Sequence, residues 1–338
     1  LAGSHLVRAA IGEVIDNEKL GGAEVQSNIS GVTDYIMKND DECIQQIRNL
    51  IEKFGKRNSA GFDRIESKLP KYPTKEILGI LPEDTIKPYD TYELLSRIVD
   101  NSEIDEYKAG YGKTIITAYA RIDGWAVGIV ANQRNVVKTE QGEMQVGGVI
   151  YSDSADKAAR FIMNCNQKKI PLIFLQDVTG FMVGSKAEHG GIIKDGAKMV
   201  NAVANSVVPK ITIIVGNSYG AGNYAMCGKA YDPRFIFAFP NARISVMGGS
   251  QAGSVLLDIK IKQEEKSGKK FSDAEKKKLL DDIIKSYDEK SYPLYAAARL
   301  WIDEIIDPSQ TREWISLCLE TADNNPDMPK FNPGVIQV

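Results

Sequence analysis

The stretch ITIIVGNSYGAGNYA, residues 211–225, places a Gly-x-Ser-x-Gly pentad directly after an apolar run. The run 211–215 predicts a buried strand, and the residues after Gly220 are typical of the start of a helix. A strand, this pentad and a helix together form the pattern of a serine-hydrolase nucleophile. Ser218 is therefore the first residue to weigh as a catalytic group.

The histidines argue against a catalytic Ser218. The chain has two, His5 and His189, and both precede the serine, whereas the hydrolase order places the histidine after it. Another triad order through His189 stays open, but a tight strand-to-helix turn is the simpler interpretation. For His189 and its neighbour Glu188 a solvent-facing start of a helix is favoured over an acid/base role.

The glycines of the same stretch suggest a different chemistry. Small residues let a ligand approach the main chain, and the first N–H groups of a helix have no internal partner. The lysine of a phosphate-binding loop is absent, and GAGNYA has Ala225 where a dinucleotide fingerprint has its last glycine, with no acidic residue at a convincing distance. A second glycine-containing loop, 176–199, follows the preceding strand. The two loops predict a cavity in which backbone donors stabilise an oxyanion.

The remaining pattern predicts an α/β fold with a mainly parallel sheet. Asp123-Gly124 between two apolar runs predicts a hairpin. Strands and helices alternate after it, which favours a parallel core with sites at the carboxyl ends of strands. The charged run 258–290 predicts a solvated surface, with a capping box at 272–275. The expected elements are helices over 155–167 and 191–207 and strands over 171–176, 210–215 and 235–239.

Composition excludes several classes of function. The net charge of −3 over 338 residues gives no electrostatic reason for a nucleic acid or an acidic membrane as partner. Four scattered cysteines predict neither a disulfide framework nor a metal site. No signal peptide or membrane-spanning run is found. We expect a reducing compartment, the cytoplasm or the mitochondrial matrix of a eukaryote.

Five long motifs carry a resemblance that covers essentially the whole chain. They resemble the carboxyltransferase (beta) subunits of biotin-dependent acyl-CoA carboxylases. By this resemblance residues 1–52 are the end of the N-terminal carboxyltransferase domain and 83–338 the C-terminal domain, with most of the N-terminal half missing. The composition of 53–82, rich in Lys, Pro and Ser, predicts an exposed linker between them. The motifs are LGGAEVQSNISGVTD, FLQDVTGFMVG, GGIIKDGAKMVNAVA, GNSYGAGNYAMCGKAYDPRF and NARISVMGGSQA.

The resemblance implies a crotonase-like ββα superhelix and transfer of CO2 from carboxybiotin to an acyl-CoA enolate. It implies that the backbone N–H groups of Ala221 and Gly222 form an oxyanion hole on the biotin side. It also implies a biotin carried on a partner, a coenzyme A thioester as substrate and no metal. The partner would be a biotin carboxylase/biotin carrier alpha subunit, and the chain would form homo-oligomers from dimer to hexamer. The residues expected to line the pocket are Thr179, Gly180, Phe181, Tyr219, Gly220 and Tyr224.

The substrate and the direction of the reaction stay open at this stage. Several motifs favour methylcrotonyl-CoA or geranyl-CoA carboxylases, and others are compatible with propionyl-CoA types. The segment 135–154 is longer than its counterpart in methylcrotonyl enzymes. Two alternatives remain: the alpha subunit of a biotin-dependent decarboxylase, and a non-catalytic module that binds biotin and oligomerises.

Overall fold

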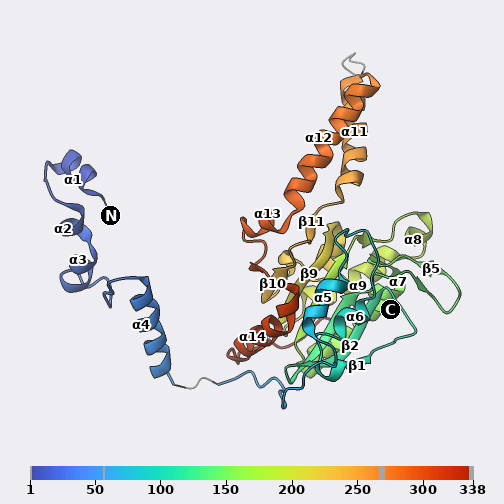
Figure 1. Ribbon diagram of the computed structural model, residues 1–338, viewed down its shortest axis with the longest axis horizontal. Coiled ribbons are helices and arrows are strands. Elements are labelled where there is room, and N and C mark those ends of the chain that lie inside the picture. The colour runs from blue at the N-terminus through green and yellow to red at the C-terminus, as the bar shows by residue number, and fades with distance from the viewer. Residues whose placement is uncertain (1, 56–57, 266–270, 335–338) are drawn as a thin grey trace. The chain divides into compact units, whose positions relative to one another are not determined.

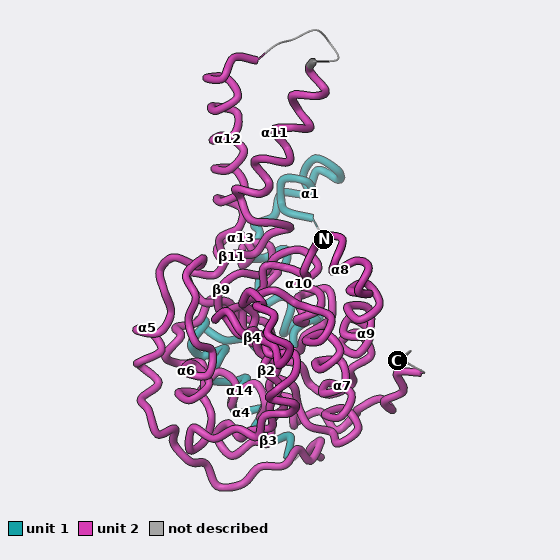
Figure 2. Tube along the Cα trace, turned by 90° about the vertical axis from the view of Figure 1, so that its right-hand side faces the viewer, with its two compact units in different colours: residues 1–57 teal, residues 58–338 magenta. Residues whose placement is uncertain are grey.

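The computed structural model describes residues 2–55, 58–265 and 271–334 (Figure 1). The chain divides into two compact units, Leu1–Arg57 and Asn58–Val338, which Figure 2 shows in different colours. The division falls within 53–82, the segment expected to be a linker. That the two units correspond to parts of two carboxyltransferase domains stays a prediction.

The first unit is built of short helices with no buried residue. Its longest helix, α4, begins after Asn39, whose side chain accepts a hydrogen bond from the N–H of Glu42 at 2.9 Å. Acidic residues in the first turn favour this end of the helix. Its Ile44, Ile47 and Ile51 are at least half exposed. The helices are α1 (Ser4–Ile11), α2 (Asn17–Gly21), α3 (Ala23–Asn28) and α4 (Asp40–Lys53).

The second unit is organised around one mixed sheet. Its strands lie in the order β1-β2-β3-β7-β9-β10-β12, with β11 paired to the far half of β9. β1 to β3 are antiparallel, and β3, β7, β9, β10 and β12 are parallel. The strands are β1 (Ile104–Glu106), β2 (Ile115–Ile122), β3 (Trp125–Asn132), β7 (Leu172–Val178), β9 (Lys210–Tyr219), β10 (Phe235–Ala238), β11 (Arg243–Ser245) and β12 (Glu304–Ile305).

The apolar runs form strands because helices cover both faces of the sheet. The hairpin predicted at Asp123-Gly124 is confirmed, and both of its turn residues have positive φ (52° and 81°). On one face, α7 (Ser152–Lys168) and α9 (Ile192–Ala204) bury their apolar sides against the central strands. On the other face, α6 (Thr91–Leu95) and α14 (Thr311–Asp323) do the same. The predicted parallel α/β core is therefore confirmed (Figure 1).

Residues 58–82 pack onto the second unit and do not stand free of it. Phe62 is 7% exposed and Ile77, which begins α5 (Ile77–Ile80), is fully buried. The N–H groups of Gly61 and Phe62 both donate to Asp323 Oδ1 at 3.0 Å. The segment was expected to be an exposed linker. In the structure, from residue 58 on, it contributes side chains to the hydrophobic core of the second unit.

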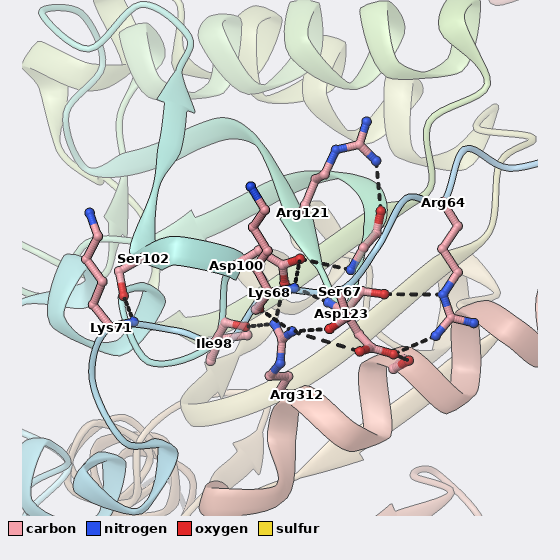
Figure 3. Close-up of polar contacts among 12 residues, drawn as sticks. Arg64, Ser67, Lys68, Lys71, Ile98, Asp100, Ser102, Arg121, Asp123 and Arg312 are labelled. Carbon is pink, nitrogen blue, oxygen red and sulfur yellow. Dashed lines mark hydrogen bonds and ion pairs between the residues drawn. The ribbon is translucent and has the colours of Figure 1, made fainter.

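A buried ion pair between Arg312 and Asp100 stabilises the end of the sheet at which the β2–β3 hairpin turns (Figure 3). Arg312 on α14 donates to Asp100 Oδ1 at 2.6 Å and to the carbonyl of Lys68 at 2.8 Å. Asp100 also accepts from the N–H groups of Asp123 (2.8 Å) and Gly124 (2.9 Å). This Arg312–Asp100 cluster joins α14, the hairpin turn and the segment that leads into the unit.

The charged run forms a helical hairpin that extends away from the sheet in both views (Figures 1 and 2). Its helices are α11 (Gly249–Glu265) and α12 (Asp273–Ser291). The predicted capping box is confirmed, because Ser272 caps α12 and the Glu275 side chain accepts from the N–H of Ser272 at 2.8 Å. Among the described helices, none combines the length and apolar composition that a membrane span requires.

Candidate functional site

The pentad lies at the end of a strand that is longer than expected. β9 continues through Ser218 to Tyr219, and α10 (Gly220–Ala225) begins at the next residue. Gly220 has φ +50°, which lets the chain turn from strand to helix without a loop. Ser218 is therefore a strand residue, and the turn is made by the second glycine of the pentad.

Ser218 is fully buried and its hydroxyl is engaged by two amides. The hydroxyl donates to Gln176 Oε1 at 2.6 Å and accepts from Asn223 Nδ2 at 2.7 Å. His189 is exposed on the short helix α8 (Ser185–His189), as is Glu188. Because no basic side chain among the described residues contacts the hydroxyl, the nucleophile interpretation is rejected for Ser218.

The first glycine of the pentad lies beside an irregularity in the sheet. Gln176 pairs with Ile214 and Val178 pairs with Ser218, so Asp177 alone faces three residues of β9. A Cβ on Gly216 would lie 2.3 Å from Asp177 Oδ2. Only glycine leaves room for that carboxylate, which explains the residue without any ligand.

Gly222, the next glycine after the pentad, allows α10 to pack against the loop that follows β7. A Cβ on Gly222 would lie 2.6 Å from Val178 Cγ2 and 3.2 Å from the Cα of Gly180. The loop after β7 and the turn after β9 are therefore adjacent, as the sequence predicts. Ala221 and Gly222 belong to the first turn of α10, where backbone N–H groups lack a partner within the helix.

A largely apolar cavity of about 900 Å³ opens beside α10. Gly220, Ala221 and Tyr224 line it, which brings three of the predicted site residues together. Tyr295 and Trp301, whose rings lie 5.9 Å apart edge to face, form another part of its wall. Neither aromatic residue belongs to a motif that predicts a site. The only sequence pattern that could have indicated them is the spacing of aromatic residues in YPLYAAARLW, and this spacing is equally typical of one face of a helix.

A second cavity of about 650 Å³ takes other predicted residues. Thr179 and Tyr219 line it, together with Arg134 and Arg243. Burial raises the pKa of the Tyr219 hydroxyl, so this group is a neutral donor at physiological pH. The predicted residues thus surround two cavities that the turn at 219–221 separates.

Three predicted residues line neither of these cavities. Gly180 and Gly222 form the contact between the two loops. Phe181 packs against α9, where a Cβ on Gly196 would lie 2.8 Å from its ring. These residues hold the loops in place and are not part of a cavity wall.

The segment 135–154, expected to be unusually long, forms part of the same site. Its strand β6 (Val149–Ile150) pairs with β8 (Gly180–Phe181) in parallel. The N–H of Thr179 donates to the carbonyl of Gly148 at 2.8 Å. Before β6 the segment forms a small hairpin of β4 (Val137–Lys138) and β5 (Met144–Gln145). The conformation of the loop after β7 therefore depends on this segment.

The titratable groups give no sign of a metal centre. In the part of the chain that the structure describes, no three His, Cys, Asp or Glu side chains cluster as metal ligands would. The chemistry available at the turn is that of backbone N–H donors next to an apolar, aromatic cavity. Such an arrangement suits a ligand with one polar oxygen on an apolar body.

Comparison with known proteins gives consistent matches. The model of the carboxyl transferase domain matches residues 1–335. The biotin-dependent 3-methylcrotonyl-coenzyme A carboxylase beta1 subunit of Mycobacterium tuberculosis is 47% identical over 326 residues, which are 96% of this chain and 59% of the relative. The chain therefore spans about three fifths of the length of that relative.

Solved structures agree with the sequence comparison. The beta subunit of geranyl-CoA carboxylase from P. aeruginosa superimposes with a TM-score of 0.78 at 38% identity, covering 98% of this chain and 60% of that one. The transcarboxylase 12S hexamer with hydrolysed methylmalonyl-coenzyme A bound gives a TM-score of 0.70 at 33% identity, covering 100% and 62%.

Proposed function

The chain belongs to the carboxyl transferase domain family, and from this membership we propose that it takes part in the carboxyltransferase step of a biotin-dependent acyl-CoA carboxylase. The predicted crotonase-like fold is confirmed by the same matches. The proposed reaction transfers CO2 from carboxybiotin to the enolate of an acyl-CoA.

The observation that carries the proposal is the turn at the end of β9. There Ala221 lines the 900 Å³ cavity, and Gly222 follows it in the first turn of α10, packed against Val178. We assign to these two N–H groups the binding of the ureido oxygen of biotin. Hydrogen bonds from fixed N–H groups stabilise a developing oxyanion because they need no reorganisation during the reaction.

The residues of the cavity fit biotin in size and polarity. When bound, biotin supplies the carboxyl group and the base that takes the substrate proton. Tyr224, Tyr295 and Trp301 provide an aromatic wall against which its apolar part can pack. Ser218, buried behind the turn, stays a hydrogen-bonding residue in this scheme. In this scheme the described part of the chain contributes orientation and backbone donors, and none of its side chains is used as an acid or base.

Substrate and partners are part of the proposal. Since the relatives named above include methylcrotonyl-CoA and geranyl-CoA carboxylase subunits, we place the substrate among branched, unsaturated acyl-CoA thioesters. A biotin-bearing alpha subunit would be the partner, and assembly through dimers to a hexamer is supported by the transcarboxylase 12S structure. Location in the cytoplasm, or in the mitochondrial matrix of a eukaryote, stays a prediction.

The two alternatives have less support. The first relative is a carboxylase subunit at 47% identity, which favours the carboxylation direction over a decarboxylase alpha subunit. A non-catalytic module that binds biotin would use the same N–H groups at 221–222, and the family match favours the carboxyltransferase because the relative named above is a carboxylase subunit.

Carboxylation by the holoenzyme tests the proposal. The protein is combined with its biotin-bearing partner, ATP, labelled bicarbonate and, in turn, acetyl-, propionyl-, methylcrotonyl- and geranyl-CoA. We expect label in the acyl product, with methylcrotonyl- or geranyl-CoA the best substrate. Absence of label with every thioester overturns the carboxylase assignment, and release of CO2 from a carboxylated thioester then supports the decarboxylase.

A further inference from the structure

Asp177 is a buried carboxylate at the point where the pairing of β7 and β9 is irregular. It is 3% exposed, and its Oδ1 accepts from the backbone N–H of Asn217 at 2.9 Å and from Asn217 Nδ2 at 3.2 Å. An irregular pairing leaves some strand N–H groups without ladder partners. The Asp177 side chain therefore replaces the missing backbone acceptor at this point of β9.

The other oxygen of Asp177 faces two further buried groups. Tyr89 donates its hydroxyl to Oδ2 at 3.2 Å, and Arg134 Nε lies 3.2 Å from the same atom. The Arg134 contact is an ion contact that is not aligned as a hydrogen bond. Arg134 Nη2 and Asn217 Nδ2 both donate to the carbonyl of Thr85, at 2.8 and 2.9 Å. The carboxylate thus joins four separate segments of the chain.

Two glycines make the space for this ion pair. Gly216 admits the carboxylate, as described above, and a Cβ on Gly148 would lie 2.2 Å from Arg134 Nη1. Gly148 also accepts the hydrogen bond from Thr179 that begins the loop after β7. The ion pair therefore contacts Gly148, which is bonded to the loop after β7, and Gly216, which lies on β9 before the turn.

We propose that Asp177 is a positioning residue, which holds the irregular stretch of β9 and thereby the turn that presents the N–H groups of Ala221 and Gly222. This inference rests on the proposed function for its catalytic consequence. The path is short, because Asn217 precedes Gly220 by three residues and no loop intervenes. Arg134, Thr85 and Asn217 also line the second cavity beside Tyr219.

Loss of the carboxylate has two physical effects. Arg134, 6% exposed, is left as a buried cation without a counter-charge, and the N–H of Asn217 loses a charged acceptor. Both effects act on the segment that leads into α10. A displacement of about 1 Å at a reacting centre is enough to lower turnover by about 100-fold.

The Arg312–Asp100 cluster provides a matched control. It is also a buried Arg–Asp pair whose carboxylate accepts backbone N–H groups, but it lies at the hairpin turn that precedes β3 (Figure 3). The experiment compares Asp177→Asn with Asp100→Asn. Hydrogen exchange is followed by mass spectrometry in peptides that cover 216–226, and carboxylation is followed in the holoenzyme. Tyr89→Phe, which removes a single hydrogen bond, is the milder variant if Asp177→Asn does not fold.

We expect Asp177→Asn to lose protection in 216–226 and to lower kcat by up to about 100-fold with little change in the KM of the acyl-CoA. Tyr89→Phe should also lower the protection of 216–226 and kcat, each by less than Asp177→Asn does. Asp100→Asn should lose stability but keep the protection of 216–226 and kcat. The inference is wrong if exchange in 216–226 is the same in Asp177→Asn or Tyr89→Phe as in the wild type, or rises equally in Asp100→Asn. A wild type without carboxylation refutes the proposed function instead, and the exchange data still decide whether Asp177 holds the turn.

Discussion

Ser218 on β9 donates its hydroxyl hydrogen to the amide oxygen of Gln176 on β7, over 2.6 Å. Gln176 in turn donates through Nε2 to the carbonyl of Met226 at 2.7 Å, just after α10. Asn223 on α10 donates back to Ser218. The serine is one member of a closed set of amide hydrogen bonds beneath the turn, and an amide has no basic site to accept its proton in a reaction.

Ser218→Ala should therefore cost stability much more than turnover. The buried amide of Gln176 and the half-buried amide of Asn223 each lose a hydrogen-bond partner, so we expect the free energy of unfolding to fall by about 1–3 kcal/mol. The contact of Gly222 with Val178 remains, and kcat should fall less than about tenfold, whereas loss of a serine nucleophile costs about 10⁶. Denaturant unfolding and carboxylation by the same preparation measure both. Complete loss of activity in a folded variant would contradict this account of the site.

Gly222→Ala should lower activity sharply. The added Cβ would lie 2.6 Å from a methyl group of Val178, whose branched side chain has little freedom to move. The helix start must shift, and loss of one donor to an oxyanion costs about 100- to 1,000-fold in kcat. Gly79→Ala is the control, because no atom lies within 4 Å of its added Cβ. Equal activity of the two variants would show that the position of α10 is unimportant.

Asp177 should impose an acid limit on activity. Burial raises its pKa, against the opposing effects of Arg134, the N–H of Asn217 and the Tyr89 hydroxyl. It therefore takes up a proton at a higher pH than the usual value of about 3.9, and the ion pair is then lost. We expect the kcat of the wild type to fall as the pH is lowered through this raised pKa, and Asp177→Asn to lack that step.

Protonation of Asp177 should change the free energy of unfolding in the opposite direction to kcat: it lowers kcat but raises stability. Because the native pKa of Asp177 lies above the unfolded one, protonation favours the folded state. The contribution is fully present below the unfolded pKa and is lost as the pH rises through the native pKa. Unfolding of the wild type and of Asp177→Asn across this range measures it. Parallel curves for the two proteins would refute the assignment.

The cysteines should differ in reactivity. Burial raises the pKa of Cys165 to about 12, of Cys227 to about 11 and of Cys318 to about 12, while Cys43 is exposed. Thiolates are the reactive form, so a disulfide reagent at pH 8 should modify Cys43 quickly and the other three only on unfolding. Cys43→Ser should remove the fast phase. A fast phase that persists in this variant would place another thiol at the surface.

The sheet could be predicted from the sequence because its strands are apolar runs separated by turn residues. The hairpin at Asp123-Gly124 and the order of strands and helices from Ala155 to Phe239 follow from local pattern alone. The end of β9 could not, since Gly216 and Gly220 suggest a turn earlier than it occurs. The irregular pairing with β7, which only the neighbouring strand reveals, keeps this part of the chain extended.

The candidate site was predictable only where adjacent residues form it. The turn at 219–222 was found through its glycines, whereas Tyr295 and Trp301 approach it from residues far along the chain. Asp177 was read as part of a loop, and its function depends on Arg134 and Tyr89, neither of which a local pattern connects to it. Long-range partners of this kind leave no periodicity in the sequence.

The amide beneath Ser218 has a wider consequence for the pentad. A Gly-x-Ser-x-Gly sequence specifies only a backbone that needs small residues on both sides of a serine. Whether that backbone carries a nucleophile is decided by the groups that contact the hydroxyl: an imidazole can activate it, whereas here it is held by the side-chain amides of Gln176 and Asn223. The pentad alone therefore does not distinguish a serine hydrolase from a protein in which the same turn is used for its backbone N–H groups, as we propose here.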